Sequence, residues 1–283
     1  MHIALRFLLA TVAWFSFAES QSSAATDIPF AYRDGMICLK VDAGTPGAPL
    51  TFLLDSGAGQ SVLNLATAQR LGLKLGARET VQGVDGSCPA YRVEGLAATV
   101  GRVAVPRRML ALDLRSVGAA CGMHIDGLLG ADFFREHVVQ IDFAAQKLRL
   151  LSRDEVSTGA GVAQAVPLAR RNDALCFRVG VNGGAPQWMR LDTGCSSALE
   201  WVTGNGFSRS DAGISVAATG GSGRCIETEV LLGAERVNAV KTGVHRQPMF
   251  PGEAGLVGNG LLSQFRVTVD ASGGRLWLAR VGR

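Results

Sequence analysis

An internal repeat is the feature of this sequence that most constrains its fold. Residues Ile28–Val41 align with Val166–Val179 at an offset of 138, with five identities in fourteen positions. Four further pairs of blocks follow in the same order, at offsets of 137 and then 128: Leu53–Gly57 with Arg190–Gly194, Gly83–Cys88 with Gly220–Cys225, Gly127–Gly130 with Gly255–Gly258, and Val139–Leu148 with Val267–Leu276. Repeated segments in constant order indicate a duplicated structural unit. Two copies favour a pair of lobes related by a pseudo-twofold axis over a solenoid.

The repeat divides the chain into two homologous lobes. We expect an N-terminal lobe over residues 28–151 and a C-terminal lobe over residues 166–283. Residues 152–165 between them are small and polar, which is typical of a linker.

The segment before the first repeat, residues 1–25, has the pattern of a secretory signal peptide. Arg6 lies in a weakly basic start, Phe7–Phe17 is apolar, and Ser23-Ala24-Ala25 supplies small residues for cleavage. The alternative is an uncleaved N-terminal anchor. We therefore expect an exported protein, periplasmic or secreted.

Composition excludes several classes of protein. With 47% hydrophobic and 18% charged residues, the chain is too apolar to be disordered. The net charge of +4 comes from scattered Arg, and no basic run is interleaved with aromatics, so nucleic acid is not an expected partner. Beyond the N-terminus no run of 18 apolar residues occurs, so no stable membrane span is expected unless the signal is uncleaved.

Local patterns predict an all-β chain with a few short helices. Two hairpins are expected, Met36–Val41 with Leu50–Leu54 and Val139–Phe143 with Lys147–Leu151. Leu65–Leu73 is the main helix candidate, with Asn64 as its N-cap. Short helical turns are expected over Ala131–His137 and Gly260–Phe265.

Each lobe carries the triplet Asp-Ser/Thr-Gly after an apolar strand, at Asp55 and at Asp192. A single such triplet is common in turns, but a pseudo-twofold axis would bring these two copies face to face. Two adjacent carboxylates cannot both ionise and therefore share one proton. The charged carboxylate can then take a proton from water while the protonated one donates to a carbonyl oxygen. The pair therefore predicts general acid and base catalysis without a covalent intermediate.

The residues beside the two Asp have predicted supporting roles. The hydroxyls of Ser56 and Thr193 are expected to donate to the carboxylates and hold their orientation, the alternative being a simple turn hydrogen bond. Gly57 and Gly194 are expected to let the two backbones approach closely, where a Cβ would clash.

These motifs carry a family resemblance. The two triplets, each followed by a hydrophobic-hydrophobic-Gly block ending at Gly130 and at Gly258, resemble those of aspartic proteases. Each lobe is similar in size to the bacterial retropepsin-like aspartyl proteases, and the two-lobed single chain resembles the pepsins. The resemblance covers nearly the whole chain after the signal. It implies a two-lobed acid-protease fold, Asp55 and Asp192 as catalytic dyad, a peptide or protein substrate, a monomer, and no metal or organic cofactor.

The same resemblance implies a glycine-bearing flap hairpin that closes over the substrate. Its glycines would be Gly83 and Gly86 in the first lobe and Gly220 and Gly223 in the second. Tyr91 is the candidate for the flap Tyr of pepsins, since only Tyr32 and Tyr91 are present.

Neither Asp126 nor the histidines are expected to form a further site. Asp126 has Ala254 as its counterpart in the second lobe, so it is not expected to be catalytic. The four His show no metal-ligand spacing, so no metal site is expected.

The six cysteines favour disulfides in an exported protein. Repeat symmetry predicts one per lobe, Cys38–Cys88 and Cys176–Cys225, and leaves Cys121 and Cys195 unmatched. Cys195 lies beside the predicted dyad, as a small buried residue, a disulfide partner or a redox-sensitive thiol.

Two other functions remain open from sequence. One is a peptide-binding module that keeps the scaffold without turnover. The other is a processing or self-cleaving protease with a narrow substrate range, because the residues of the specificity pockets lie on loops that the sequence does not place.

Overall fold

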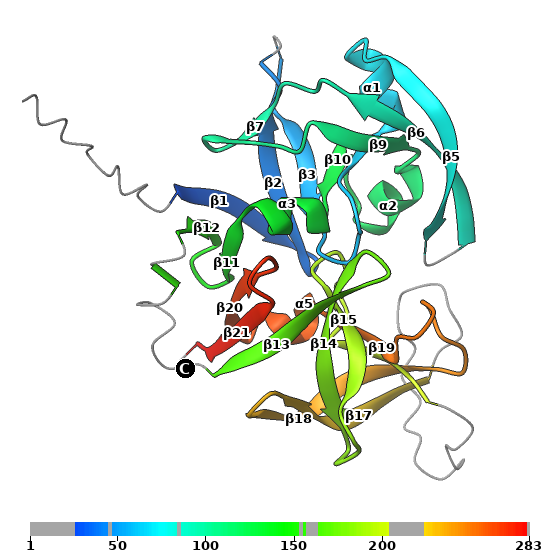
Figure 1. The fold of residues 1–283 in the computed structure, drawn as a ribbon. Helices are drawn as coiled ribbons and strands as arrows, with labels where there is room; N and C mark the ends of the chain where they lie inside the picture. The colour runs from blue at the N-terminus through cyan, green and yellow to red at the C-terminus, as the bar shows by residue number, and fades with distance from the viewer. Residues whose placement is uncertain are drawn as a thin grey trace, which may run out of the picture.

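The computed structural model describes residues 26–44, 47–83, 86–152, 155–156, 164–203 and 224–281. The chain is mostly strand with a few short helices and forms two lobes, as Figure 1 shows. The predicted all-β, two-lobed fold is confirmed. The predicted signal (1–25) and most of the predicted linker (152–165) lie outside the described residues.

The N-terminal lobe contains twelve strands and three helices among the described residues. The strands are β1 (Thr26–Arg33), β2 (Met36–Asp42), β3 (Leu50–Leu54), β4 (Val62–Asn64), β5 (Leu75–Gly83), β6 (Gly86–Glu94), β7 (Thr99–Val100), β8 (Val103–Ala104), β9 (Arg108–Leu112), β10 (Gly127–Leu129), β11 (Val138–Asp142) and β12 (Lys147–Leu151). The helices are α1 (Leu65–Arg70), α2 (Arg115–Ala120) and α3 (Ala131–Glu136).

The C-terminal lobe contains nine strands and one helix over its described part. The strands are β13 (Ala165–Arg171), β14 (Ala174–Val181), β15 (Gln187–Asp192), β16 (Leu199–Val202), β17 (Arg224–Leu232), β18 (Glu235–His245), β19 (Gly255–Gly258), β20 (Phe265–Asp270) and β21 (Arg275–Arg280). The helix is α5 (Asn259–Leu262).

The sequence repeat is also a repeat of strand pairing. Ala31 of β1 lies opposite Cys38 of β2, and Ala169 of β13 lies opposite Cys176 of β14, which is the same register at an offset of 138. β3 runs parallel to β10 in the first lobe, as β15 runs parallel to β19 in the second. Each lobe therefore builds the same sheet around the strand that leads to its Asp triplet.

A six-stranded antiparallel sheet joins the lobes in the described chain, in the order β1–β12–β11–β20–β21–β13. At its centre Gln140 of β11 lies opposite Thr268 of β20, and the Gln140 Nε2 donates to the Thr268 Oγ1 over 3.1 Å. These two residues are equivalent at the repeat offset of 128. A pseudo-twofold axis therefore passes between them, as the repeat predicts.

The predicted hairpins β2–β3 and β11–β12 are confirmed, as are the short helical turns α3 and α5. Helix α1 is shorter than predicted. Asn64 caps it as expected, with its Oδ1 accepting from the Ala66 amide at 3.2 Å, but the helix ends at Arg70. Gly72 follows with φ of +66°, the left-handed conformation that commonly terminates a helix. No helix among the described residues is long and apolar enough to span a membrane.

The predicted disulfides Cys38–Cys88 and Cys176–Cys225 are wrong, since all six cysteines are free thiols. Cys38 lies on β2, which pairs with β1, β3 and β7 in the described structure, whereas Cys88 lies on β6. The Cys38 Sγ instead contacts the Met123 Sδ at 3.6 Å, within an apolar cluster that also holds Cys121.

Candidate active site

The two Asp triplets follow equivalent buried strands. Asp55 comes directly after β3, and Asp192 is the last residue of β15. Each strand lies in the middle of its lobe's sheet, paired on one side with an antiparallel strand and on the other with a parallel one. The Asp55 amide donates to the Leu129 carbonyl over 2.8 Å, which ties its loop to β10. Both carboxyl groups are thereby delivered from rigid strands to the junction of the lobes.

The structure brings the two predicted catalytic residues together. The carboxyl groups of Asp55 and Asp192 lie within hydrogen-bonding distance of each other. Gly57 and Gly194 permit this contact. A Cβ on Gly57 would lie 2.5 Å from the Asp192 Cγ, and one on Gly194 would lie 2.5 Å from the Asp55 Oδ1. Any larger residue at either position would have to displace the carboxyl group of the opposite lobe.

The hydroxyls of Ser56 and Thr193 form a reciprocal network across the axis. The Ser56 Oγ donates to the Leu191 carbonyl over 2.7 Å, and the Thr193 Oγ1 donates to the Leu54 carbonyl over 2.9 Å. Each hydroxyl also accepts from the amide of the opposite residue, at 2.9 Å for the Ser56 amide and 3.1 Å for the Thr193 amide. The predicted donation to the carboxylates is therefore wrong. Each hydroxyl has one proton, and it is used to hold the opposite lobe's backbone.

The two carboxylates differ in their backbone hydrogen bonds. The Asp55 Oδ1 accepts from the amides of Gly57 and Ala58, each at 3.0 Å, whereas the Asp192 Oδ1 accepts from the Gly194 amide at 3.0 Å. Amide donors stabilise the ionised form of a carboxyl group. Asp55 is therefore the better-stabilised anion of the pair.

Burial raises the pKa of both carboxyl groups. For Asp192, burial and then the charge of Asp55 raise the pKa to about 7. For Asp55, burial again raises the pKa, while the amides of Ala58 and Gly57 lower it. Two carboxyls in contact titrate as a pair. The pair therefore keeps a single proton at pH values well above the ordinary pKa of an Asp.

A buried ion pair that was not predicted from sequence lies behind the dyad. Arg190, two residues before Asp192, binds Glu253 through two hydrogen bonds of 2.8 Å, and its Nη1 donates to the Gly57 carbonyl over 2.8 Å. Its guanidinium also stacks on the ring of Phe250 at 3.3 Å from the centroid. The available signal was a charged residue between two apolar ones, Met189 and Leu191, in a strand that leads to an Asp triplet.

Asn259 is a second residue that sequence reasoning missed. Its Nδ2 donates to the Thr193 carbonyl and to the Gly35 carbonyl, each over 2.7 Å, so it ties the loop that follows Asp192 to the β1–β2 turn. The Tyr32 hydroxyl donates to the Asn259 backbone carbonyl over 3.4 Å. The other tyrosine, Tyr91, lies on β6 opposite Ala111.

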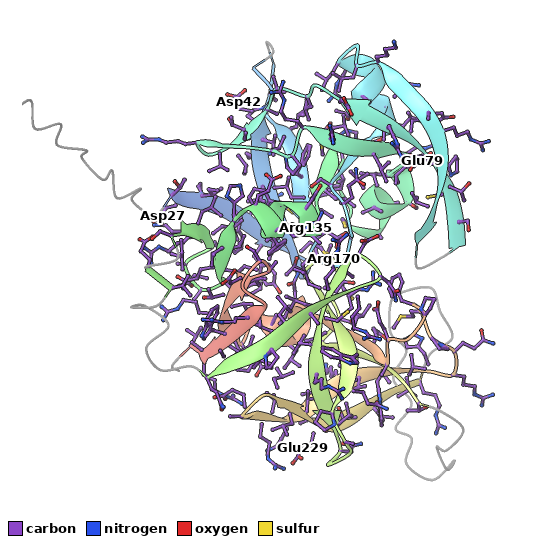
Figure 2. All side chains as sticks on the ribbon, viewed as in Figure 1. Asp27, Asp42, Glu79, Arg135, Arg170 and Glu229 are labelled. Atoms are coloured by element: carbon purple, nitrogen blue, oxygen red, sulfur yellow. The ribbon has the colours of Figure 1, made fainter. Side chains whose placement is uncertain are left out.

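Two arginines lie near the junction of the lobes, and each contacts a partner in its own lobe. Figure 2 shows Arg135 and Arg170 near the junction of the lobes, while Asp42, Glu79 and Glu229 lie at the outer ends of the molecule. The Arg135 Nη1 donates to the Gly59 carbonyl over 3.3 Å, and Arg170 pairs with Asp173.

The predicted flap glycines are described only in part. Gly83 and Gly86 are opposite each other at the end of the β5–β6 hairpin. Gly220 and Gly223 lie outside the described residues. The flap role of all four stays a prediction.

Cys195 is a neutral thiol beside the dyad. Burial and then the charge of Asp192 raise its pKa to about 12, and its Sγ lies 2.9 Å from the Ser197 Oγ. The raised pKa argues against a reactive thiolate, because nucleophilic cysteines have lowered values.

Asp126 has a structural environment. Burial acts to raise its pKa, but hydrogen bonds from the Thr51 amide, the Thr67 hydroxyl and Arg70 lower it overall. It thereby fastens helix α1 to the start of β3. Within the described ranges, no group of three or more His, Cys, Asp or Glu is placed to hold a metal ion.

Comparison with known proteins agrees with this geometry. The family described as aspartyl protease matches residues 41–133. The fold is similar to that of an aspartic proteinase from Irpex lacteus, with a TM-score of 0.60 and 12% identity over 92% of this chain and 98% of that one. It is also similar to Basic 7S globulin from soybean, with a TM-score of 0.56 and 11% identity over 90% and 94% of the two chains. No curated protein matches. The chain thus has the two-lobed fold of the aspartic proteinases.

Proposed function

We propose that this chain, which has the aspartic-proteinase fold, is an endopeptidase that hydrolyses peptide bonds with water activated by Asp55 and Asp192. The observation that carries the proposal is the contact of two carboxyl groups, one from each lobe. Burial raises the pKa of both carboxyls, and the charge of Asp55 raises that of Asp192 further, so the pair provides an acid and a base at the same pH. Fold alone does not decide activity, so the proposal stands on this pair.

The backbone hydrogen bonds suggest which carboxyl has which role. Asp55 accepts two amide hydrogen bonds and serves as the ionised base, which takes a proton from water. Asp192, with its pKa raised to about 7, holds the shared proton and donates it to the carbonyl oxygen of the peptide. The water oxygen adds to the carbonyl carbon and gives a tetrahedral diol. The C–N bond then breaks as Asp55 passes its proton to the leaving nitrogen. One hydroxyl of the diol gives its proton to Asp192 as it becomes the new carbonyl oxygen, so the pair again holds one proton.

The rigid surroundings of the pair support this chemistry. The cross-lobe bonds of Ser56 and Thr193 fix the two loops relative to each other before any substrate binds. Catalytic groups held in position avoid the cost of reorganisation during the reaction. We propose an extended, largely apolar peptide segment as substrate, bound under the β5–β6 hairpin, and export as the route to it.

The test is digestion of a proteome-derived peptide library between pH 3 and pH 7, with cleavage sites read by mass spectrometry. We expect cleavage by the wild-type protein, loss of cleavage in Asp55→Asn and in Asp192→Asn, and no effect of a chelator. The matched control is Asp113→Asn, which removes an exposed carboxylate whose partner is Arg115. Full activity in either dyad variant would refute the proposal.

The rival function is a peptide-binding module without turnover. The fold is also that of a protein named a globulin. If the wild-type protein binds library peptides but cleaves none of them at any pH, its function is that of a peptide-binding module.

A further inference from the structure

The two lobes differ at two positions directly behind the catalytic pair. Arg190 is the counterpart of Leu53 at the repeat offset of 137, and Glu253 is the counterpart of Ile125 at the offset of 128. In the N-terminal lobe, Leu53 and Ile125 are fully buried members of one apolar cluster. The C-terminal lobe replaces this apolar contact with an ion pair.

The ion pair is completely enclosed. The side chains of Arg190 and Glu253 are 7% and 1% exposed. A buried ion pair is seldom more stabilising than an apolar pair of similar size, because both charges lose their hydration. The N-terminal lobe shows that the same sheet is built with the apolar pair. Stability alone therefore does not explain the substitution.

Arg190 reaches from one lobe into the other. It lies on β15 of the C-terminal lobe, yet its Nη1 donates to the carbonyl of Gly57 in the catalytic loop of the N-terminal lobe. Gly57 is also the residue whose amide binds Asp55 and whose Cα faces Asp192. The guanidinium therefore holds the Gly57–Ala58 peptide, whose N–H also donates to the Asp55 Oδ1 over 3.0 Å.

We propose that Arg190 is a positioning residue of the dyad. Held by Glu253, it fixes the Gly57 loop across the lobe junction and places a permanent positive charge behind the two carboxyl groups. Only one part of this inference, the effect of Arg190 on turnover, rests on the proposed function. The clamp and the charge act on the carboxyls whether or not a peptide is cleaved.

The charges that face the dyad are few. In the described structure they are Arg190, whose charge lowers the pKa of both carboxyls, and Glu253, whose charge raises that of Asp192. The nearby thiols of Cys195 and Cys176 have pKa values raised to about 12, chiefly by burial, and stay neutral at working pH. Removing one member of the ion pair or both should therefore change the titration of the dyad in a predictable direction.

Three variants separate charge from positioning. Glu253→Gln leaves the Arg190 charge uncompensated and should lower the apparent pKa values of the dyad. The double variant Arg190→Leu with Glu253→Ile recreates the apolar pair of the N-terminal lobe and should raise them by about 1 unit. Arg190→Lys keeps the charge but loses the planar fork that binds Glu253 and Gly57 together. It should leave the apparent pKa values near wild type and reduce kcat at unchanged KM.

The experiment is a titration of the Asp carboxyl carbons by ¹³C NMR, with signals assigned from Asp55→Asn and Asp192→Asn. A control pair of the same residue types, Arg236 and Glu229, lies on the surface of the same lobe. Changing both to Gln should leave the apparent pKa values of the dyad unchanged. The titration needs no turnover, so a wild-type protein that cleaves no peptide refutes the proposed function without deciding this inference. If the folded double variant titrates as wild type does, the proposal is overturned, whatever Glu253→Gln shows.

Discussion

The shared proton of the dyad should appear in the stability of the protein as well as in its activity. Asp192 has a pKa of about 7 in the folded state, raised by burial and then by Asp55. An unfolded Asp has a pKa of about 3.9. The folded state therefore binds the proton more tightly, and folding is favoured at low pH. A difference of about 3 units corresponds to about 4 kcal/mol, lost progressively as the pH rises from about 4 to about 7.

Substitution of Asp192 by Asn isolates this contribution. The variant has no titrating group at position 192, and its amide can still donate to Asp55. The difference in free energy of unfolding, variant minus wild type, should increase as the pH rises from 4 to 7, by up to about 4 kcal/mol. The assay is denaturant unfolding of both proteins at several pH values. Asp113→Asn is the control, since that carboxylate is exposed and its pKa is lowered by Arg115. Parallel curves for wild type and Asp192→Asn over this range would refute the reasoning.

Three further outcomes follow from the same geometry. Thr193→Val should cost about 1–3 kcal/mol of unfolding free energy, because the Leu54 carbonyl and the Ser56 amide lose a buried partner; equal stability in chemical denaturation would contradict this. Gly57→Ala should reduce kcat/KM at least about 100-fold, because its Cβ displaces the Asp192 carboxyl; near wild-type kinetics would show that the approach is not tight. Alkylation of freshly purified, denatured protein without reductant should label all six cysteines by mass, whereas incomplete labelling that reduction restores would indicate a disulfide.

Much of the fold could be predicted because the sequence contains two copies of the same structural unit. Short alternating strands and turn residues are local signals, and their repetition at constant offsets fixed the expected pseudo-twofold axis. The observed register of Gln140 against Thr268 places that axis as expected. The paired Asp triplets were found for the same reason.

The errors concern contacts that no local pattern records. Repeat symmetry cannot show which strands are neighbours. It therefore predicted a disulfide between the cysteines of β2 and β6, although these two strands do not pair with each other. The hydroxyls of Ser56 and Thr193 were assigned to the nearest carboxylates in sequence, whereas their acceptors lie 135 and 139 residues away.

Arg190 and Asn259 were missed because attention to the repeat favours what the lobes share. Both residues break the symmetry: Arg190 stands where the first lobe has Leu53, and Asn259 where it has Ala131. Each binds a carbonyl of a catalytic loop. The positions at which one lobe departs from its twin were therefore the informative ones.

The most direct test of the catalytic pair is the affinity of a statine-containing peptide, whose hydroxyl mimics the attacking water. We expect tight binding to the wild-type protein at pH 5, and weakening by at least about 100-fold in Asp192→Asn. Equal affinity in the wild type and the variant would contradict the central claim that Asp55 and Asp192 act together through one shared proton.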